Sequence, residues 1–157
     1  MSVLVETSAG DLVIDLFVDE CPKTCLNFLK LCKMKYYNNC LFYDVQKDYL
    51  AQTGDPSNSG GSGTSIWGLT GGDRFFADEI NPNEERSRKF DKPGLVAMAN
   101  KGPNMNGSAF FISLADLKEG QMLHKRHTIF GVVAEGLDTT LKKINSSYVN
   151  PKNNRPY

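Results

Sequence analysis

The sequence has no excess of charge of either sign, because 18 lysine and arginine residues balance 18 aspartate and glutamate residues. A domain that neutralises nucleic-acid phosphates needs a basic excess or a basic stripe. We therefore expect this domain to bind no nucleic acid directly. The sequence also lacks an apolar run near the roughly 20 residues of a membrane span, and it lacks the charged start and apolar block of a secretory signal. These absences predict no membrane association and a location in the nucleus or cytoplasm.

Metal-binding patterns are missing as well. The four cysteines, Cys21, Cys25, Cys32 and Cys40, form no Cys-x-x-Cys pair, and no histidine cluster lies near them. We expect no zinc site and no cofactor. Without a secretory signal the four thiols are expected to be reduced. Cys25 and Cys32 are seven residues apart, so they share one helix face and act there as small hydrophobic groups.

Two stretches show no helix or strand periodicity. Residues 54–72 hold seven of the 14 glycines and are predicted to form a long loop, either ordered or mobile, with no helix. This loop has no Gly-Lys-Ser/Thr, which argues against a phosphate-binding loop. The charged run at residues 81–92, NPNEERSRKFDK, is most simply a solvated connection.

Short strands dominate what the sequence does contain. Apolar and polar residues alternate over 3–7 and 12–17 around a turn, which predicts a β-hairpin. Short apolar runs bounded by turn residues predict further strands. These strands are expected at residues 41–45, 49–52, 95–99, 109–112 and 128–133.

Two helices are expected. Pro22 opens a segment whose apolar residues recur at helical spacing up to Tyr36, so a helix is predicted over residues 22–36. A shorter helix is predicted over 136–145, with Lys142 and Lys143 in its last turn, where cations suit the helix dipole. A length of 157 residues fits one domain, residues 1–157, and many strands with two helices predict a mainly β fold, most simply a closed barrel.

The stretch at residues 94–112, GLVAMANKGPNMNGSAFFI, combines two buried strands with a polar loop. Small Ala97 and Ala99 alternate with larger residues, which leaves room for a flat group on one strand face. The loop between the strands is rich in Asn and Gly and presents hydrogen-bonding groups. This pattern favours a shallow apolar pocket with amide groups at its rim, which would suit an extended peptide.

Several segments together resemble the cyclophilin family of peptidyl-prolyl cis-trans isomerases. They are CPKTCLNFLKLC, QTGDP, GGSGTSIWG, GLVAMANKGPNMNGSAFFI and HTIFGVVAEGLD, in the family's order. The resemblance implies an eight-stranded antiparallel β-barrel capped by two α-helices, with proline bound in a groove on the outer surface. The segment YYNNCLFYDVQKDYLAQTGDP is most similar to a divergent branch of nuclear, spliceosome-associated cyclophilins that carry an RNA-recognition module. We expect an N-terminal domain of a longer protein, a monomer, whose last barrel strand is missing or supplied otherwise.

The resemblance also implies a substrate-binding site. The proline pocket would be formed by Tyr49, Leu50, Phe111, Leu123 and His127, and the peptide groove would be lined by Gln52, Ala99 and Asn100. Without the family, core packing would be the simpler role for Phe111, Leu50 and Leu123, and an ordinary surface role the simpler one for His127.

The catalytic positions depart from the family's pattern. Tyr43 and Asp44 stand where the family usually has His-Arg, so a carboxylate replaces the arginine that donates to the twisted amide. Ala109 replaces a glutamine that contacts peptide backbone. Met122 replaces a tryptophan that packs on cyclosporin, so weak or no cyclosporin binding is expected. Lys101 replaces a small residue, which narrows a neighbouring pocket or selects acidic peptides.

Two functions follow, and the sequence leaves both open. One is a prolyl isomerase of reduced turnover that acts on proline-containing peptides. The other is a non-catalytic module that binds a proline-containing segment in a nuclear ribonucleoprotein or splicing assembly. Lys47 lies three residues after Asp44 and is the nearest cation along the chain, although that spacing along a strand end disfavours its reaching the same atom. A domain without any peptide groove fits the combined site residues poorly.

Overall fold

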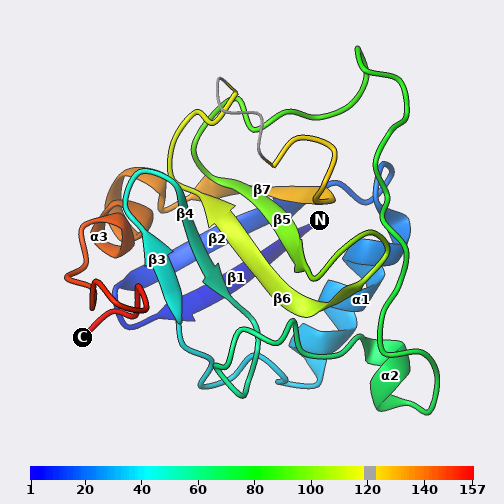
Figure 1. The fold of residues 1–157 in the computed structure, drawn as a ribbon, viewed down its shortest axis with the longest axis horizontal. Helices are drawn as coiled ribbons and strands as arrows, with labels where there is room; N and C mark the ends of the chain where they lie inside the picture. Colours follow the sequence, from blue (N-terminus) through cyan, green and yellow to red (C-terminus); the bar gives the residue numbers. More distant parts are fainter. Residues whose placement is uncertain (119–122) are drawn as a thin grey trace.

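The structure of the protein is a computed structural model that describes residues 1–118 and 123–157. In this part of the chain seven strands form one antiparallel sheet, in the order β1-β2-β7-β5-β6-β4-β3 (Figure 1). The strands are β1 (Ser2–Thr7), β2 (Gly10–Leu16), β3 (Asp44–Gln46), β4 (Leu50–Thr53), β5 (Leu95–Asn100), β6 (Asn106–Ser113) and β7 (Ile129–Glu135).

The predicted mainly β fold is confirmed, and the sheet curls into a half-barrel (Figure 1). Among the described residues the two edge strands, β1 and β3, do not pair with each other, so the sheet is not closed into the barrel that we expected. The carboxyl-terminal segment runs beside β3, where the Val45 N–H donates to the Asn154 carbonyl at 2.9 Å.

Two strand boundaries differ by three residues from the sequence prediction, and the others differ by two or fewer. β3 begins at Asp44 rather than at residue 41, because the backbone of Leu41 binds side chains: its N–H donates to Asn58 at 3.0 Å and its carbonyl accepts from Thr53 at 2.8 Å. β6 begins at Asn106 rather than at 109, since Asn106 already pairs with Asn100 of β5 and with Phe76. Both differences come from contacts between segments far apart in the sequence.

The helices also depart from the prediction. Helix α1 (Pro22–Lys33) stops before Tyr36, because Lys35 adopts a left-handed backbone with φ +58°. The predicted helix over 136–145 consists of a π-helical turn, η1 (Leu137–Leu141), followed by α3 (Lys142–Asn145). None of the described helices has both the length and the apolar composition that crossing a bilayer requires.

The expectation that residues 54–72 contain no helix is wrong. Helix α2 (Ile66–Leu69) lies inside this stretch, and the Ser65 hydroxyl caps it by accepting from the Gly68 N–H at 3.2 Å. Buried Asn27 of α1 adds a tertiary contact, because its side-chain oxygen accepts from the Ile66 N–H at 2.8 Å. A four-residue helix held in this way leaves no periodicity for the sequence to show.

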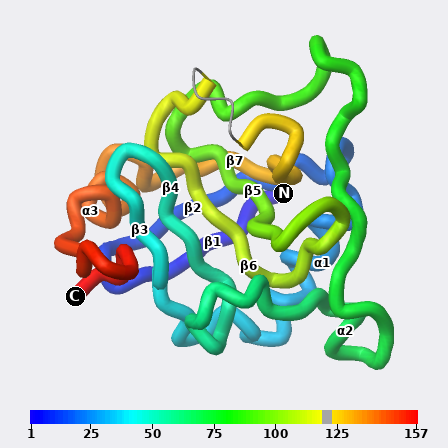
Figure 2. The backbone as a smooth tube through the Cα atoms, viewed as in Figure 1, coloured from blue at the N-terminus to red at the C-terminus, as the bar shows by residue number. Residues whose placement is uncertain are grey.

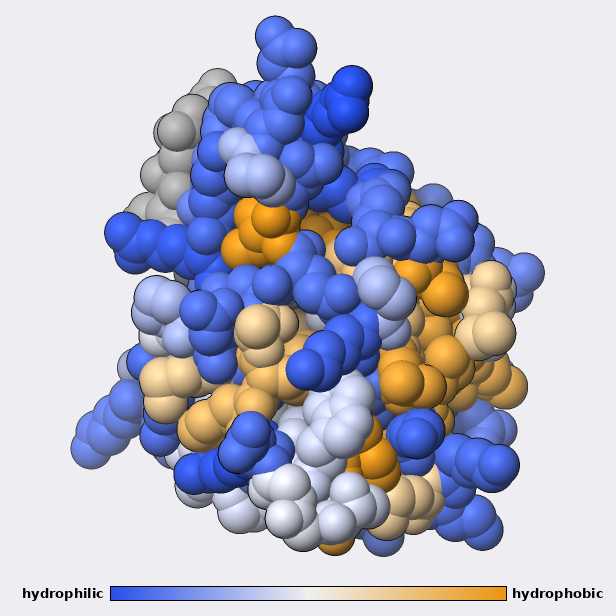
Figure 3. Space-filling view, turned by 90° about the vertical axis from the view of Figure 1, so that its right-hand side faces the viewer, coloured by the Kyte–Doolittle hydropathy of each residue, from blue (hydrophilic) through white to orange (hydrophobic). Residues whose placement is uncertain are grey.

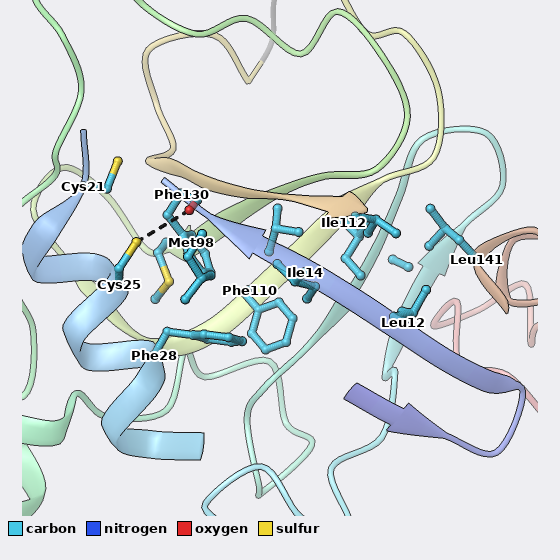
Figure 4. Packing of buried hydrophobic residues seen from close by; sticks show 14 of the residues in the cluster. Leu12, Ile14, Cys21, Cys25, Phe28, Met98, Phe110, Ile112, Phe130 and Leu141 are labelled. Atoms are coloured by element: carbon cyan, nitrogen blue, oxygen red, sulfur yellow. Dashed lines mark hydrogen bonds between the residues drawn. The ribbon is translucent and has the colours of Figure 1, made fainter. Parts of the chain in front are cut away.

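The main core covers the concave side of the sheet, from α1 at one end to Leu141 of η1 at the other (Figure 4). Phe28 of α1 is fully buried and packs its ring near Phe110 and Phe130, with centroids 5.4 and 5.3 Å away. Figure 4 also shows Cys25 facing the Phe130 carbonyl, to which its thiol donates at 3.6 Å. Burial raises the pKa of the Cys25 thiol to about 11, so at neutral pH this cysteine is a neutral packing group.

The first part of the 54–72 loop is ordered around one carboxylate. Asp55 is 3% exposed, and its Oδ2 accepts from the N–H groups of Ser59, Gly60 and Gly61 at 3.0–3.2 Å. Its Oδ1 accepts from the Ser57 N–H at 3.0 Å and from the Ser57 hydroxyl at 2.7 Å. Burial alone would raise the pKa of Asp55, but these hydrogen bonds outweigh it and hold the pKa below its ordinary value of 3.8.

Asp55→Asn is expected to destabilise the protein by about 1–3 kcal/mol at pH 7. The side-chain NH2 of asparagine would face backbone N–H groups, and a donor cannot accept their hydrogen bonds. The carboxylate of the wild type stabilises the fold fully above the ordinary pKa and loses this contribution as the pH falls through the lowered folded value. Urea unfolding at pH 7 and at about pH 3 measures both effects. The difference in free energy of unfolding between wild type and Asp55→Asn should narrow at the lower pH. The control Asp91→Asn, at an exposed position, should match the wild type at both pH values. An equal gap at both pH values would contradict this account.

Candidate functional site

Three predicted site residues lie in one row across neighbouring strands. Asp44 of β3 pairs with Gln52 of β4, and Gln52 pairs in turn with Phe111 of β6, which pairs with Ala97 of β5. Directly paired residues point to the same face of a sheet. The flanking residues Val45 and Ala51 belong to the main core, so this row lies on the opposite, outer face.

A second apolar cluster covers this outer face. It is formed by Leu50, Phe90, Leu95, Ala97, Ala99, Ala109, Phe111 and Ile129, with Phe17, Tyr49, Leu117, Leu123 and Val132 packed against it. Six of the predicted binding residues therefore lie in one cluster: Tyr49, Leu50, Ala99, Ala109, Phe111 and Leu123. Phe111 is only 1% exposed, so its own neighbours fill the space around its ring in this structure.

Polar groups line the β3 side of the row. The Gln52 side-chain amide donates to the Tyr43 hydroxyl at 2.8 Å, and burial raises the pKa of Tyr43. The Asp44 carboxylate accepts from the Gln46 amide, with 3.3 Å to each oxygen. Within the described residues Asp44 forms no ion pair, and exposed Lys47 lies in none either. The Asp44 carboxylate thus shares one row of the sheet with Gln52 and Phe111.

His127 meets the edge of Phe111, with ring centroids 5.1 Å apart and an angle of 86° between the rings. Its Nδ1 lies 2.9 Å from the Met98 carbonyl and 3.3 Å from the Asn100 amide nitrogen. A carbonyl only accepts hydrogen bonds, so Nδ1 carries the hydrogen and Nε2 of the neutral ring carries none. The Asn100 amide donates instead to the Arg126 carbonyl at 2.7 Å. Burial lowers the pKa of His127 below 6.5, which keeps the ring neutral at neutral pH.

Nitrogen NMR of labelled His127 should therefore show the Nδ1–H tautomer and a titration midpoint below 6.5, because burial disfavours the charged ring. Since the folded pKa is the lower one, this histidine costs stability as the pH falls below the unfolded value and costs none above it. A midpoint above 6.5, or the Nε2–H tautomer, would contradict the assignment.

Two predicted residues are not part of this arrangement. Lys101 is exposed beyond the end of β5. Met122 lies outside the described residues. One residue that the sequence analysis missed belongs to the cluster: Phe90 is 4% exposed and stacks on Phe111 with centroids 5.7 Å apart and planes 23° apart. The signal that could have found it is a lone aromatic residue within the charged run at 81–92, which the sequence alone predicts to be a solvated connection.

Two hollows border the cluster. In a cavity of about 490 Å³, seven of the 14 lining residues are charged, and His127, Phe90 and Ile129 are among the others. A smaller pocket of about 100 Å³ is lined by Phe90, Leu117 and Leu123, with charged side chains around them. Each hollow therefore reaches one predicted pocket residue, His127 or Leu123.

Comparison with known proteins identifies the family of this chain and a similar structure. Residues 2–157 match the family described as cyclophilin type peptidyl-prolyl cis-trans isomerase/CLD. This chain belongs to the cyclophilin family. A cyclophilin type peptidyl-prolyl cis-trans isomerase of Cryptosporidium parvum has a similar structure, with a TM-score of 0.86, 38% identity, and coverage of 99% of this chain and 89% of that one.

Curated cyclophilins are also similar in sequence. Peptidyl-prolyl cis-trans isomerase CYP59 of Arabidopsis thaliana is 54% identical over all of this chain and 30% of its own length. Peptidyl-prolyl cis-trans isomerase-like 4 of Homo sapiens is 47% identical over 95% of this chain and 29% of its own length. The chain thus spans about a third of the length of these relatives. A shorter relative, peptidyl-prolyl cis-trans isomerase-like 3 of Gallus gallus, is 43% identical and is covered over 89% of its length.

Proposed function

We propose that this cyclophilin domain binds X-Pro peptide segments at the outer cluster around Phe111 and isomerises them slowly. The observation that carries the proposal is the row of Asp44, Gln52 and Phe111, in which a carboxylate shares a face with the proposed proline pocket. A second structure of the Cryptosporidium parvum cyclophilin was determined in the presence of the dipeptide Ala-Pro, which supports a proline-containing ligand for the fold.

The reaction needs no covalent step. Rotation about an X-Pro bond faces a barrier of roughly 20 kcal/mol, because the amide is conjugated. A pocket lowers the barrier by holding the proline ring while the preceding carbonyl turns, and a donor stabilises the twisted amide. Ionised Asp44 only accepts hydrogen bonds and repels a carbonyl oxygen, so it places the wrong sign of charge at this point. The apolar part of the site still removes water from the amide, which leaves a low rate.

Binding also requires the cluster to open. Phe111 is 1% exposed, so a proline ring that packs on it has to displace part of its cover. The pocket of about 100 Å³ beside Phe90 and Leu123 is the natural starting point, since both residues belong to the same cluster. This cost predicts weak affinity in addition to slow turnover.

The second candidate is a non-catalytic module that binds a proline-containing segment, and Asp44 and Ala109 favour it because each lacks a donor that the family's pattern supplies. The chain would then be the N-terminal domain of a longer nuclear protein, in a ribonucleoprotein or splicing assembly. Its length relative to the curated relatives supports a multidomain protein.

NMR exchange spectroscopy on an X-Pro peptide separates the two. The proposal predicts exchange cross-peaks between cis and trans forms that grow with the concentration of domain. Peptide shifts that saturate without exchange cross-peaks would support the binding module instead. The absence of both peptide shifts and exchange cross-peaks at millimolar peptide would contradict both functions.

A further inference from the structure

The segment at residues 81–92 is exposed except for two residues. It belongs to the connection between α2 and β5, which runs along the outside of the molecule, and it forms a hydrophilic projection at the top of the side view (Figures 2 and 3). Only Ser87 and Phe90 are buried in it. A charged surface segment that inserts one aromatic ring into the candidate site calls for a specific explanation.

Phe90 holds one face of Phe111. The two rings are stacked at 5.7 Å, while His127 meets Phe111 from its edge at 5.1 Å. Phe90 also lines both the cavity that reaches His127 and the pocket that reaches Leu123, so it is a wall between them. Aromatic pairs favour both of these arrangements, so the two neighbours stabilise the ring of Phe111 in its present position.

One backbone contact and one side-chain contact hold the segment around Phe90. The Phe90 carbonyl accepts from the Leu117 N–H at 2.7 Å. Two residues earlier, the Arg88 guanidinium donates to both carboxylate oxygens of Glu20 at 2.7 Å and lies 3.5 Å above the ring of Phe17. Arg88 lowers the pKa of Glu20, mainly through this hydrogen bonding, so the pair stays charged at neutral pH.

We propose that Phe90 is a positioning residue, which fixes Phe111 for contact with a proline ring, and that Arg88 holds Phe90 in place through Glu20 and Phe17. This inference rests on the proposed function for its ligand. Phe90 is 4% exposed, its carbonyl is hydrogen-bonded to the Leu117 N–H, and the side chain of Arg88 is paired with Glu20, which distinguishes a fixed wall from a lid that opens. Phe111 would then keep its orientation while other parts of its cover give way to the ligand.

The variant Phe90→Leu tests this, because it keeps an apolar side chain and removes the flat ring. Phe76→Leu is the matched control: Phe76 is also 4% exposed but belongs to the main core and packs on Trp67. Two measurements are made on folded protein: the ring signals of Phe111 by NMR without ligand, and the affinity for an X-Pro peptide by titration. Urea unfolding checks that both variants lose similar stability.

Phe90→Leu should shift and broaden the Phe111 ring signals and weaken peptide affinity about 2- to 10-fold, the range expected for one aromatic pair. Phe76→Leu should do neither. Arg88→Ala should weaken affinity less, and should add nothing in the Phe90→Leu background, because the two act through the same ring.

Three outcomes would overturn the proposal. Unchanged Phe111 signals in Phe90→Leu, or equal loss of affinity in Phe76→Leu, would reduce Phe90 to a core residue. A gain in affinity would make it a cover rather than a support. If the wild type bound no X-Pro peptide, the proposed function would fail, whereas the Phe111 signals would still decide whether Phe90 positions that ring.

Discussion

Asp44→Arg is expected to raise kcat/KM for an X-Pro peptide by about 10²-fold or more. The loss of one well-placed donor costs an enzyme about 10²–10³ in rate, and this substitution both supplies a donor and removes a repelling charge. Asp44 pairs with Gln52, which pairs with Phe111, so the new guanidinium would extend from the same face as the proposed pocket. The protease-coupled isomerisation assay and NMR exchange both measure the gain.

Two control variants separate this effect from a change in net charge. Glu6→Arg makes the same charge change on exposed β1, at the other edge of the sheet, and should leave the rate unchanged. Asp44→Asn removes the negative charge without supplying a guanidinium and should give a smaller gain. If Asp44→Arg behaved like Glu6→Arg, the diagnosis of the missing donor would be wrong.

Phe28→Ala is expected to lower the free energy of unfolding by about 3–5 kcal/mol, a large part of the 5–15 kcal/mol of a typical domain. Phe28 is fully buried, and its ring lies within 5.3–5.5 Å of three other aromatic rings, those of Tyr37, Phe110 and Phe130. Removal of the Phe28 ring leaves a cavity between α1 and the sheet. For a domain of this size the loss corresponds to a fall in Tm of roughly 6–20 °C, measurable by calorimetry.

Leu26→Ala on the same helix is the control, because Leu26 is 44% exposed. It should change the free energy of unfolding by no more than about 0.5 kcal/mol. Equal destabilisation by the two variants would mean that the helix contributes through its backbone rather than through the buried ring.

Local pattern was enough to predict the elements that face the core. Period-two alternation placed the hairpin of β1 and β2 within two residues of its observed ends, and helical spacing placed Cys25 and Phe28 on the buried face of α1. These predictions succeed because one face of each element is buried and the sequence records which one.

Other features depend on long-range contacts or on backbone conformations that no local pattern records. Helix α2 depends on an amide of Asn27 that is 39 residues away, and the early end of α1 depends on the left-handed backbone of Lys35. Phe90 lies in a charged run and is buried only because the chain returns to Phe111. The site residues were predicted from family resemblance, since composition alone does not distinguish a pocket from a core.

We expect a proline ring to bind at the cluster around Phe111, on the sheet face that also carries the Asp44 carboxylate. The most direct test is the set of intermolecular nuclear Overhauser effects between an X-Pro peptide and the labelled domain. We expect contacts from the proline ring to the rings of Phe111 and His127, and from the preceding residue to the side chain of Gln52. Contacts confined to another face of the domain would contradict it.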